Sequence, residues 1–148
     1  MLNFRILEYG SCDYHTMLDL RNEVLRKPLG LTFSDEQLQK EINDIFIAGF
    51  TTVNDKEMLA GCCILTPISE DTVQLRQMAV SPALQGKGAG SEIIMFAETY
   101  ARNNNFTILT MHARKEAIGF YLKLNYEIRG EEFTEVGIPH YEMRKTLK

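Results

Sequence analysis

Apolar residues recur at every second position in some stretches of the chain and at every third or fourth position in others. The alternating and β-branched stretches predict short strands, which fall at residues 3–9, 46–53, 58–66, 72–80, 106–111, 126–133 and 140–146. The other spacing predicts helices, at residues 13–26, from residue 34, from the glycine-rich segment to about residue 103, and at 116–124. This order predicts an α/β (α+β) fold, in which helices cover the faces of a mixed sheet.

Local signals refine several of these elements. Ser34 is followed three residues later by Gln37, the spacing of a capping box, which predicts a short second helix with Leu38, Ile42 and Ile45 on its inner face. Polar residues at 54–57 predict a hairpin turn. The segment 136–139 is predicted to be the loop between the last two strands.

Length, composition and charge narrow the class of protein. The 148 residues fit one domain, and 45% apolar with 24% charged residues is ordinary for a soluble globular protein. A net charge of −4 argues against a nucleic-acid-binding surface. No apolar run approaches the ~20 residues that span a bilayer, and residues 1–10 do not resemble a signal peptide. Three cysteines, two of them adjacent, argue against a disulfide framework and favour a protein of the reducing cytoplasm. The adjacent pair, Cys62 and Cys63, is expected to lie in the core as part of a strand.

The segment Gln85–Ser91 carries the clearest chemical signal. Gly86, Gly88 and Gly90 lack Cβ atoms, so their backbone can approach a ligand closely. A helix starts at this segment, and the first amides of a helix have no partner within it and lie at the positive end of its dipole. Lys87 adds a positive charge. Together these features predict a phosphate site, while the simpler interpretation is a flexible turn before a helix.

Two common nucleotide motifs are excluded by spacing. A Walker A loop needs Ser or Thr after Gly-Lys, but Gly88 follows Lys87. A dinucleotide fingerprint needs G-x-G-x-x-G with an acidic residue about 20 positions on. Here the glycines are spaced G-x-G-x-G, and the next predicted strand ends without an acid.

The segment instead resembles the pyrophosphate loop Gln/Arg-x-x-Gly-x-Gly/Ala of the GCN5-related N-acetyltransferase (GNAT) family. Residues 75–82, LRQMAVSP, resemble the strand that precedes this loop. Residues 117–126, AIGFYLKLNY, resemble the family's second motif, with Asn125 in place of the usual Gly. Asn tolerates the left-handed conformation that the position needs. The tail, residues 130–140, resembles the ElaA-like subgroup.

The resemblance covers nearly the whole chain and implies one N-acetyltransferase domain at residues 1–148. It implies a mostly antiparallel sheet of six to seven strands, with about four helices, that splays between its two central strands to hold acetyl-CoA as co-substrate. The implied cofactor-binding residues act mainly through their backbone and are Met78, Ala79, Val80, Gln85, Gly86, Lys87, Gly88, Ala89, Gly90 and Ser91.

Tyr121 matches the usual general acid of the family. A phenol is protonated at neutral pH and can return a proton to the departing thiolate. The residue also shares a predicted helix face with Ala117, Phe120 and Leu124, so a purely structural role in the core is the alternative.

An alkylamine acceptor is mostly protonated at neutral pH and must lose a proton before it attacks. The candidates for this step are His140, His112, Glu135 and Gln77, the last only as a residue that positions water. His140 is placed slightly ahead as a partly exposed residue after the Gly-Ile-Pro turn, although it can also brace that turn. Arg26 and Lys27 either meet an acidic group of the acceptor or form the basic end of a helix.

The leading hypothesis is direct transfer of an acetyl group, in a ternary complex, to the amine of a small molecule or peptide. The alternatives are a non-catalytic module that senses acyl-CoA and a different nucleotide-binding protein. No metal-ligand spacing is present, so no metal is expected. No membrane or nucleic-acid partner is expected, and a homodimer is consistent with how common dimers are.

Overall fold

The computed structural model describes residues 2–147. Seven strands form one sheet in the order β1-β2-β3-β4-β5-β7-β6. Their bounds are β1 Asn3–Leu7, β2 Ile45–Val53, β3 Lys56–Pro67, β4 Thr72–Val80, β5 Ile108–Arg114, β6 Glu127–Glu135 and β7 Ile138–Thr146. The α-helices are α1 Cys12–Arg21, α2 Asp35–Gln39, α3 Ala89–Asn103 and α4 Ile118–Lys123. The predicted α+β fold is confirmed, since the β4–β5 ladder is parallel and the ladders β1–β2, β2–β3, β5–β7 and β6–β7 are antiparallel.

The chain divides into two compact units. Of the described residues, the first contains 2–66 and 77–97, and the second contains 67–76 and 98–147. Strand β4 changes unit at its middle, between Arg76 and Gln77, and helix α3 changes unit between Ala97 and Glu98.

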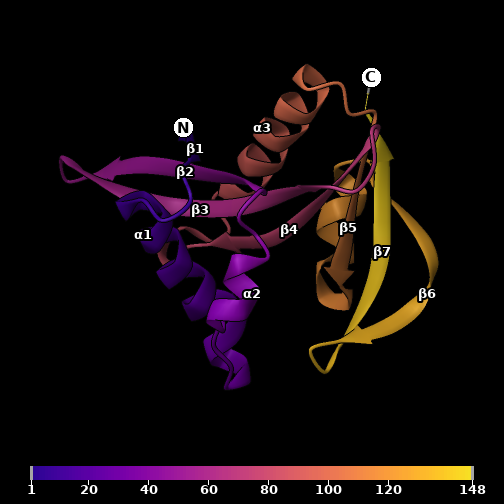
Figure 1. Ribbon diagram of the computed structural model, residues 1–148, viewed down its shortest axis with the longest axis horizontal. Helices are drawn as coiled ribbons and strands as arrows, with labels where there is room; N and C mark the ends of the chain where they lie inside the picture. Colours follow the sequence, from indigo (N-terminus) through magenta and orange to yellow (C-terminus); the bar gives the residue numbers. More distant parts are fainter. Residues whose placement is uncertain (1, 148) are drawn as a thin grey trace. The chain divides into compact units, whose positions relative to one another are not determined.

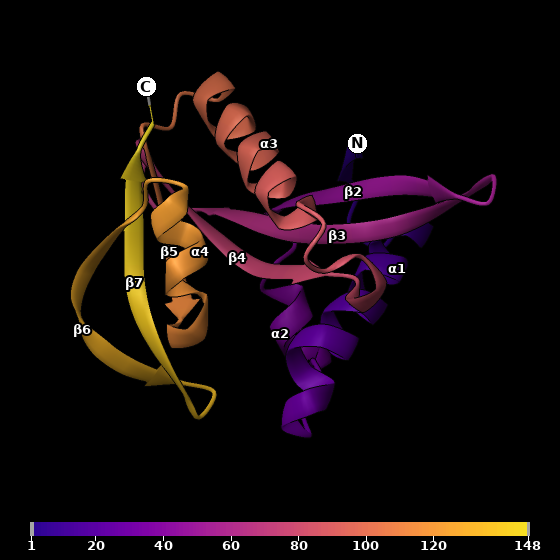
Figure 2. The ribbon, with the colours of Figure 1, turned by 180° about the vertical axis from the view of Figure 1, so that it is seen from behind.

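The first unit is built on the antiparallel strands β1, β2 and β3. Figures 1 and 2 show α1 and α2 on one side of β2 and β3, with the start of α3 on the other side. The core on the α1 side is formed by buried residues that include Tyr14, Met17, Leu18, Leu20, Phe46, Phe50, Leu59, Cys62 and Ile64. Burying each large apolar side chain contributes about 1.5–3 kcal/mol to folding.

The helical segment after β1 extends beyond the α-helix α1 in turns of other types. Ser11 caps α1 by accepting a hydrogen bond from the backbone N–H of Tyr14. The helix continues from Asn22 to Arg26 as a wider π-type turn and from Lys27 to Leu29 as a 3₁₀ turn. Gly30 then ends it with a positive φ of 71°, a conformation that glycine adopts without strain.

Helix α2 has the predicted capping box, with reciprocal bonds between Ser34 and Gln37. Its predicted inner face is wrong beyond Leu38, because the helix ends at Gln39 and Ile42 is 56% exposed. Ile45 already belongs to β2. Turns at residues 40–44 therefore replace the last part of the predicted helical pattern.

Both hairpin turns are shorter than predicted. Between β2 and β3 only Asn54 and Asp55 lie outside the strands, both with positive φ, as a two-residue turn of type I′ requires. Between β6 and β7 the turn is Val136–Gly137, again with positive φ at both positions. The predicted loop at 136–139 is therefore wrong, since its last two residues belong to β7.

The second unit contains β5, β7 and β6 with α4 beside β5 (Figures 1 and 2). Residues 72–75 of β4 pair in parallel with residues 108–111 of β5, over four of the nine residues of β4. Tyr126 is buried and donates its hydroxyl to Glu98, which also binds Lys145. Asn125 adopts the left-handed conformation expected at the exit of α4, with φ 72°.

None of the helices formed by residues 2–147 has both the length and the apolar character needed to cross a membrane.

Candidate functional site

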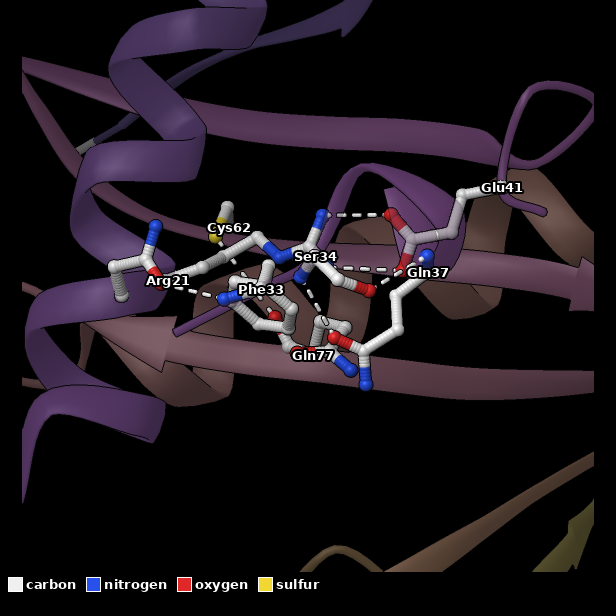
Figure 3. Close-up of polar contacts among 8 residues, drawn as sticks. Arg21, Phe33, Ser34, Gln37, Glu41, Cys62 and Gln77 are labelled. Carbon is white, nitrogen blue, oxygen red and sulfur yellow. Dashed lines mark hydrogen bonds and ion pairs between the residues drawn. The ribbon is translucent and has the colours of Figure 1, made fainter. Parts of the chain in front are cut away.

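Strand β4 contains a residue in an unusual backbone conformation. Gln77 has φ 54°, a left-handed value that is uncommon for residues other than glycine and requires support from the surroundings. The thiol of Cys62 on β3 donates a hydrogen bond to the Gln77 carbonyl oxygen, with an S–O distance of 3.8 Å (Figure 3). This kink separates the regular first half of β4 from Met78, Ala79 and Val80.

The Cys62 side chain is fully buried. Burial raises the pKa of its thiol to about 12, although the Arg21 guanidinium opposes this change. The group therefore stays a protonated thiol at neutral pH and can donate the hydrogen bond to Gln77. Cys62 and Cys63 are both core residues, as the sequence indicated.

Beyond the kink, β4 lies close to β3. The backbone N–H of Ser81 donates to the carbonyl oxygen of Ala60, 2.8 Å away. A Cβ atom at Gly61 would lie 2.8 Å from the carbonyl oxygen of Ala79 and 2.6 Å from the Cδ1 atom of Ile93. Only glycine permits this approach, because real Cβ atoms are almost never found under 3.0 Å from such atoms.

The loop between β4 and α3 is tied to the strand that it leaves. The Gln85 side-chain amide donates to the carbonyl oxygen of Val80, 3.1 Å away. Gly86 and Gly88 have φ values of 79° and 85°, which side chains rarely allow. The conformation of the loop thus depends on two of the three glycines that the sequence singled out, while Gly90 lies inside α3.

Helix α3 begins at Ala89, and Glu92 donates its backbone N–H to the carbonyl oxygen of Gly88. The amides before Glu92 consequently lack an acceptor within the helix. The nearby Glu92 carboxylate accepts a hydrogen bond from the backbone N–H of Leu2 at 3.2 Å, and Lys87 is exposed. This group of amides can bind an anion such as a pyrophosphate.

A buried ion pair supports the helices on the opposite side of β3. Arg21 is 0% exposed, and its two terminal nitrogens lie 3.0 and 2.9 Å from the carboxylate oxygens of Glu41 (Figure 3). The Phe33 ring lies 4.4 Å from the Arg21 guanidinium and 4.5 Å from that of Arg26. Arg26, a candidate contact for an acidic acceptor, therefore packs on Phe33, and Lys27 is exposed.

Tyr121, the candidate general acid, lies in α4 in the second unit and is 7% exposed. Its ring makes edge contacts with Phe120 and Tyr126, at centroid distances of 5.0 and 5.9 Å. Its carbonyl oxygen accepts the backbone N–H groups of Leu124 and Tyr126. The prediction that Phe120 faces inward with Tyr121 is wrong, because Phe120 is 36% exposed.

Three candidates for proton transfer from the amine come together in the second unit. His112 Nδ1 lies 3.0 Å from one carboxylate oxygen of Glu135, and His140 Nε2 lies 3.8 Å from the other. His140 is only 4% exposed and lies within β7. The expectation of a partly exposed loop histidine is therefore wrong, because the shorter turn draws residues 138–140 into the strand.

The structure thus groups the implied cofactor residues in the first unit and the implied catalytic residues in the second. Sequence reasoning did not identify the Cys62–Gln77 contact or the Arg21–Glu41 pair. Each joins residues 15 or 20 positions apart, and no local pattern marks such partners. It also missed Phe133, whose ring contacts the rings of both His112 and His140, at centroid distances of 5.0 and 5.9 Å.

Residues 21–147 match the acetyltransferase (GNAT) domain family. The chain belongs to this family. Its sequence is 33% identical to YyaT of Bacillus subtilis (strain 168) over 76 residues, which cover 51% of each protein. It is also 26% identical, over 140 residues, to a second protein of that strain assigned as an acetyltransferase, covering 90% of this chain and 89% of that protein. The chain thus spans about half the length of YyaT.

Solved structures of GNAT proteins share the fold. An assigned N-acetyltransferase of Lactobacillus plantarum superposes with a TM-score of 0.85 at 19% identity, covering 98% of this chain and 99% of that protein. Escherichia coli ElaA gives a TM-score of 0.78 at 19% identity, with coverage of 98% and 99%. An aminoglycoside 6'-N-acetyltransferase complexed with coenzyme A gives 0.78 at 14% identity, with coverage of 99% and 97%.

Proposed function

We propose that the chain is an acetyl-CoA-dependent N-acetyltransferase that acts on a primary amine of a small molecule or peptide. One observation carries the proposal: within the first unit, residues 77–80 of β4, which begin at the kink, lead through a loop with two left-handed glycines into the start of α3. The unpartnered amides of such a helix start suit a pyrophosphate. Coenzyme A in the aminoglycoside acetyltransferase of the same fold supports the choice of cofactor.

The backbone of this segment would hold the co-substrate. Met78, Ala79 and Val80 follow the kink and would pair with the pantetheine arm. The amides from Gln85 to Ser91 would bind the pyrophosphate, with Lys87 adding charge. An amide near Met78 would polarise the thioester carbonyl, a role comparable to an oxyanion hole.

The reaction would proceed by direct attack in a ternary complex. The neutral amine forms a C–N bond to the carbonyl carbon, and the C–S bond then breaks to release coenzyme A as a thiolate. Tyr121 would protonate that thiolate, since a phenol is ordinarily protonated at neutral pH. The burial of Tyr121 and its packing on Tyr126 support a fixed position for this hydroxyl.

Two measurements on the full chain test this function. Calorimetry with coenzyme A and acetyl-CoA measures binding, and free-thiol release across a panel of alkylamines, aminoglycosides and lysine peptides measures transfer. We expect binding together with amine-dependent thiol release and an acetylated product by mass spectrometry. Binding without any product would favour an acyl-CoA sensor, and the absence of binding would refute the proposal.

A further inference from the structure

Three neighbouring strands of the second unit bring two imidazoles to one carboxylate. His112 comes from β5, Glu135 from β6 and His140 from β7. The Glu135 side chain is 46% exposed and the His112 side chain 38% exposed, whereas the His140 side chain is 5% exposed. The cluster therefore has one buried and one accessible imidazole.

Hydrogen-bond chemistry fixes which nitrogen of His112 carries the proton. An ionised carboxylate can only accept hydrogen bonds, so the 3.0 Å contact requires Nδ1 of His112 to donate to Glu135. In the neutral imidazole this leaves Nε2 with its lone pair. An imidazole held in this way by a carboxylate is the arrangement that makes histidine an effective base in hydrolases.

The same reasoning gives His140 a different role. Its Nδ1 lies 2.8 Å from the carbonyl oxygen of Ile138, which only accepts, so Nδ1 donates to the first residue of β7. Its Nε2 is 3.8 Å from Glu135, which is beyond hydrogen-bond range. With its ring buried, His140 holds the start of β7, where Ile138 is the register partner of Glu135.

Packing holds the accessible imidazole in place. The Phe133 ring meets the His112 ring edge-on at 5.0 Å and stacks on His140 at 5.9 Å, with an interplanar angle of 27°.

Two other glutamates belong to the same group of strands. On β7, Glu142 is the register partner of His112. Glu132 is occupied by Lys115, 3.1 Å away, and by the Tyr141 hydroxyl.

We propose that His112 is the general base that deprotonates the acceptor amine and that Glu135 is its positioning residue. This inference rests on the proposed acetyltransferase function. An ammonium acceptor has two protons to lose in becoming an amide. Nε2 of His112 takes the first and passes it to solvent, which frees the nitrogen lone pair for attack. The second leaves the nitrogen after the C–N bond forms, and one proton ends on the thiol of coenzyme A.

The kinetic test compares wild type with His112→Gln and Glu135→Gln. The control is Glu127→Gln, on β6, the strand that also carries Glu135. General-base catalysis contributes about 10²–10⁴-fold, so we expect His112→Gln to lower kcat by a factor in that range, with an unchanged KM for acetyl-CoA. The rate of the His112→Gln variant should keep rising with pH, because the fraction of acceptor present as free amine increases. Glu135→Gln should also lower kcat, because its amide can donate to Nδ1 and select the wrong tautomer. Glu127→Gln should match wild type.

Nitrogen-15 NMR of the imidazole gives a readout that does not depend on activity. We expect a neutral His112 protonated at Nδ1 in wild type and at Nε2 in Glu135→Gln. A His112 protonated at Nε2 in wild type, or a His112→Gln variant with wild-type kcat and pH profile, would overturn the inference. If wild type binds coenzyme A yet acetylates no amine, the proposed function fails, and the base role fails with it. If wild type is active, only the variants decide this inference.

Discussion

The Cys62 thiol on β3 donates a hydrogen bond to the Gln77 carbonyl oxygen on β4, at the residue where the strand backbone enters the left-handed region. The contact joins a fully buried donor to a strained acceptor residue. Residues in such conformations cost about 1–3 kcal/mol and persist only where the surroundings hold them. The kink precedes Met78, where the thioester is proposed to bind.

Substitutions at Gln77 should separate backbone strain from side-chain chemistry. We expect Gln77→Gly to change the free energy of unfolding by no more than about 1 kcal/mol, since glycine adopts a positive φ freely. Gln77→Val should lose about 1–3 kcal/mol and bind coenzyme A more weakly, because a β-branched residue resists this conformation. Urea unfolding and calorimetry measure both effects.

The matched control is Gln74→Val, in the regular part of the same strand. Valine favours strands, so this variant should keep wild-type stability and affinity. Equal losses for Gln74→Val and Gln77→Val would show that the kink is not the cause.

Gly88→Ala should weaken coenzyme A binding while leaving the fold intact. A Cβ atom at Gly88 meets nothing within 4 Å, so the cost arises from its φ of 85° and is about 1–2 kcal/mol. If the loop changes conformation to relieve that strain, the affinity for coenzyme A should fall by about tenfold or more. Gly119→Ala, also with open space around the Cβ, is the control and should retain affinity. Unaltered affinity in Gly88→Ala would argue against the loop as the pyrophosphate site.

Tyr121→Phe should reduce kcat by about 10²–10⁴-fold, the usual contribution of a general acid, with little change in KM for acetyl-CoA. Steady-state kinetics measures both constants. Tyr126→Phe is the control: it removes the 2.8 Å hydrogen bond to buried Glu98 and should cost about 1–3 kcal/mol of stability with kcat preserved. A Tyr121→Phe enzyme of normal kcat would exclude Tyr121 as the acid.

Arg21→Met should be among the most destabilising substitutions, because it removes the guanidinium that binds both carboxylate oxygens of Glu41, a residue only 3% exposed. Breaking such a pair typically costs about 3–5 kcal/mol. The double variant Arg21→Met/Glu41→Leu should recover much of this loss, since apolar replacements of a buried pair are often neutral. Arg5→Met, which breaks two exposed ion pairs, with Asp13 and with Glu57, should change urea stability little. A double variant no more stable than Arg21→Met would contradict the explanation.

Much of the fold follows from the sequence because its causes are local. The capping box of Ser34 and Gln37 and the left-handed exit at Asn125 each depend on residues within one turn. Strand β4 and the end of α3 were also predicted at their observed bounds. The two hairpin turns were predicted too long because Lys56 and Ile138 pair across the strands, which a polar or turn-like composition does not reveal.

The candidate site was predictable only in part. The glycines act through their own backbone, so the loop could be predicted from the local amino-acid sequence alone. His112, Glu135 and His140 come from three different strands, and the contact of His112 with Glu135 spans 23 residues. The burial of His140 likewise depends on tertiary packing.

Alkaline pH should destabilise the protein through Cys62. Burial raises the pKa of the folded-state thiol from 9.0 to about 12, so this contribution to stability is complete below pH 9 and is lost as the pH rises toward 12. Between these values the unfolded chain ionises while the folded chain does not. Urea midpoints measured across this window should fall with pH, and less steeply in Cys62→Ala. An equal slope in both proteins would contradict this origin.

The most direct test of the central claim is a titration of the ¹⁵N-labelled chain with coenzyme A, followed through its backbone amide resonances. The account predicts that the largest shifts fall on residues 78–80 and 85–91, which contain the end of β4 and the start of α3. Saturable binding that leaves these amides unshifted would contradict it.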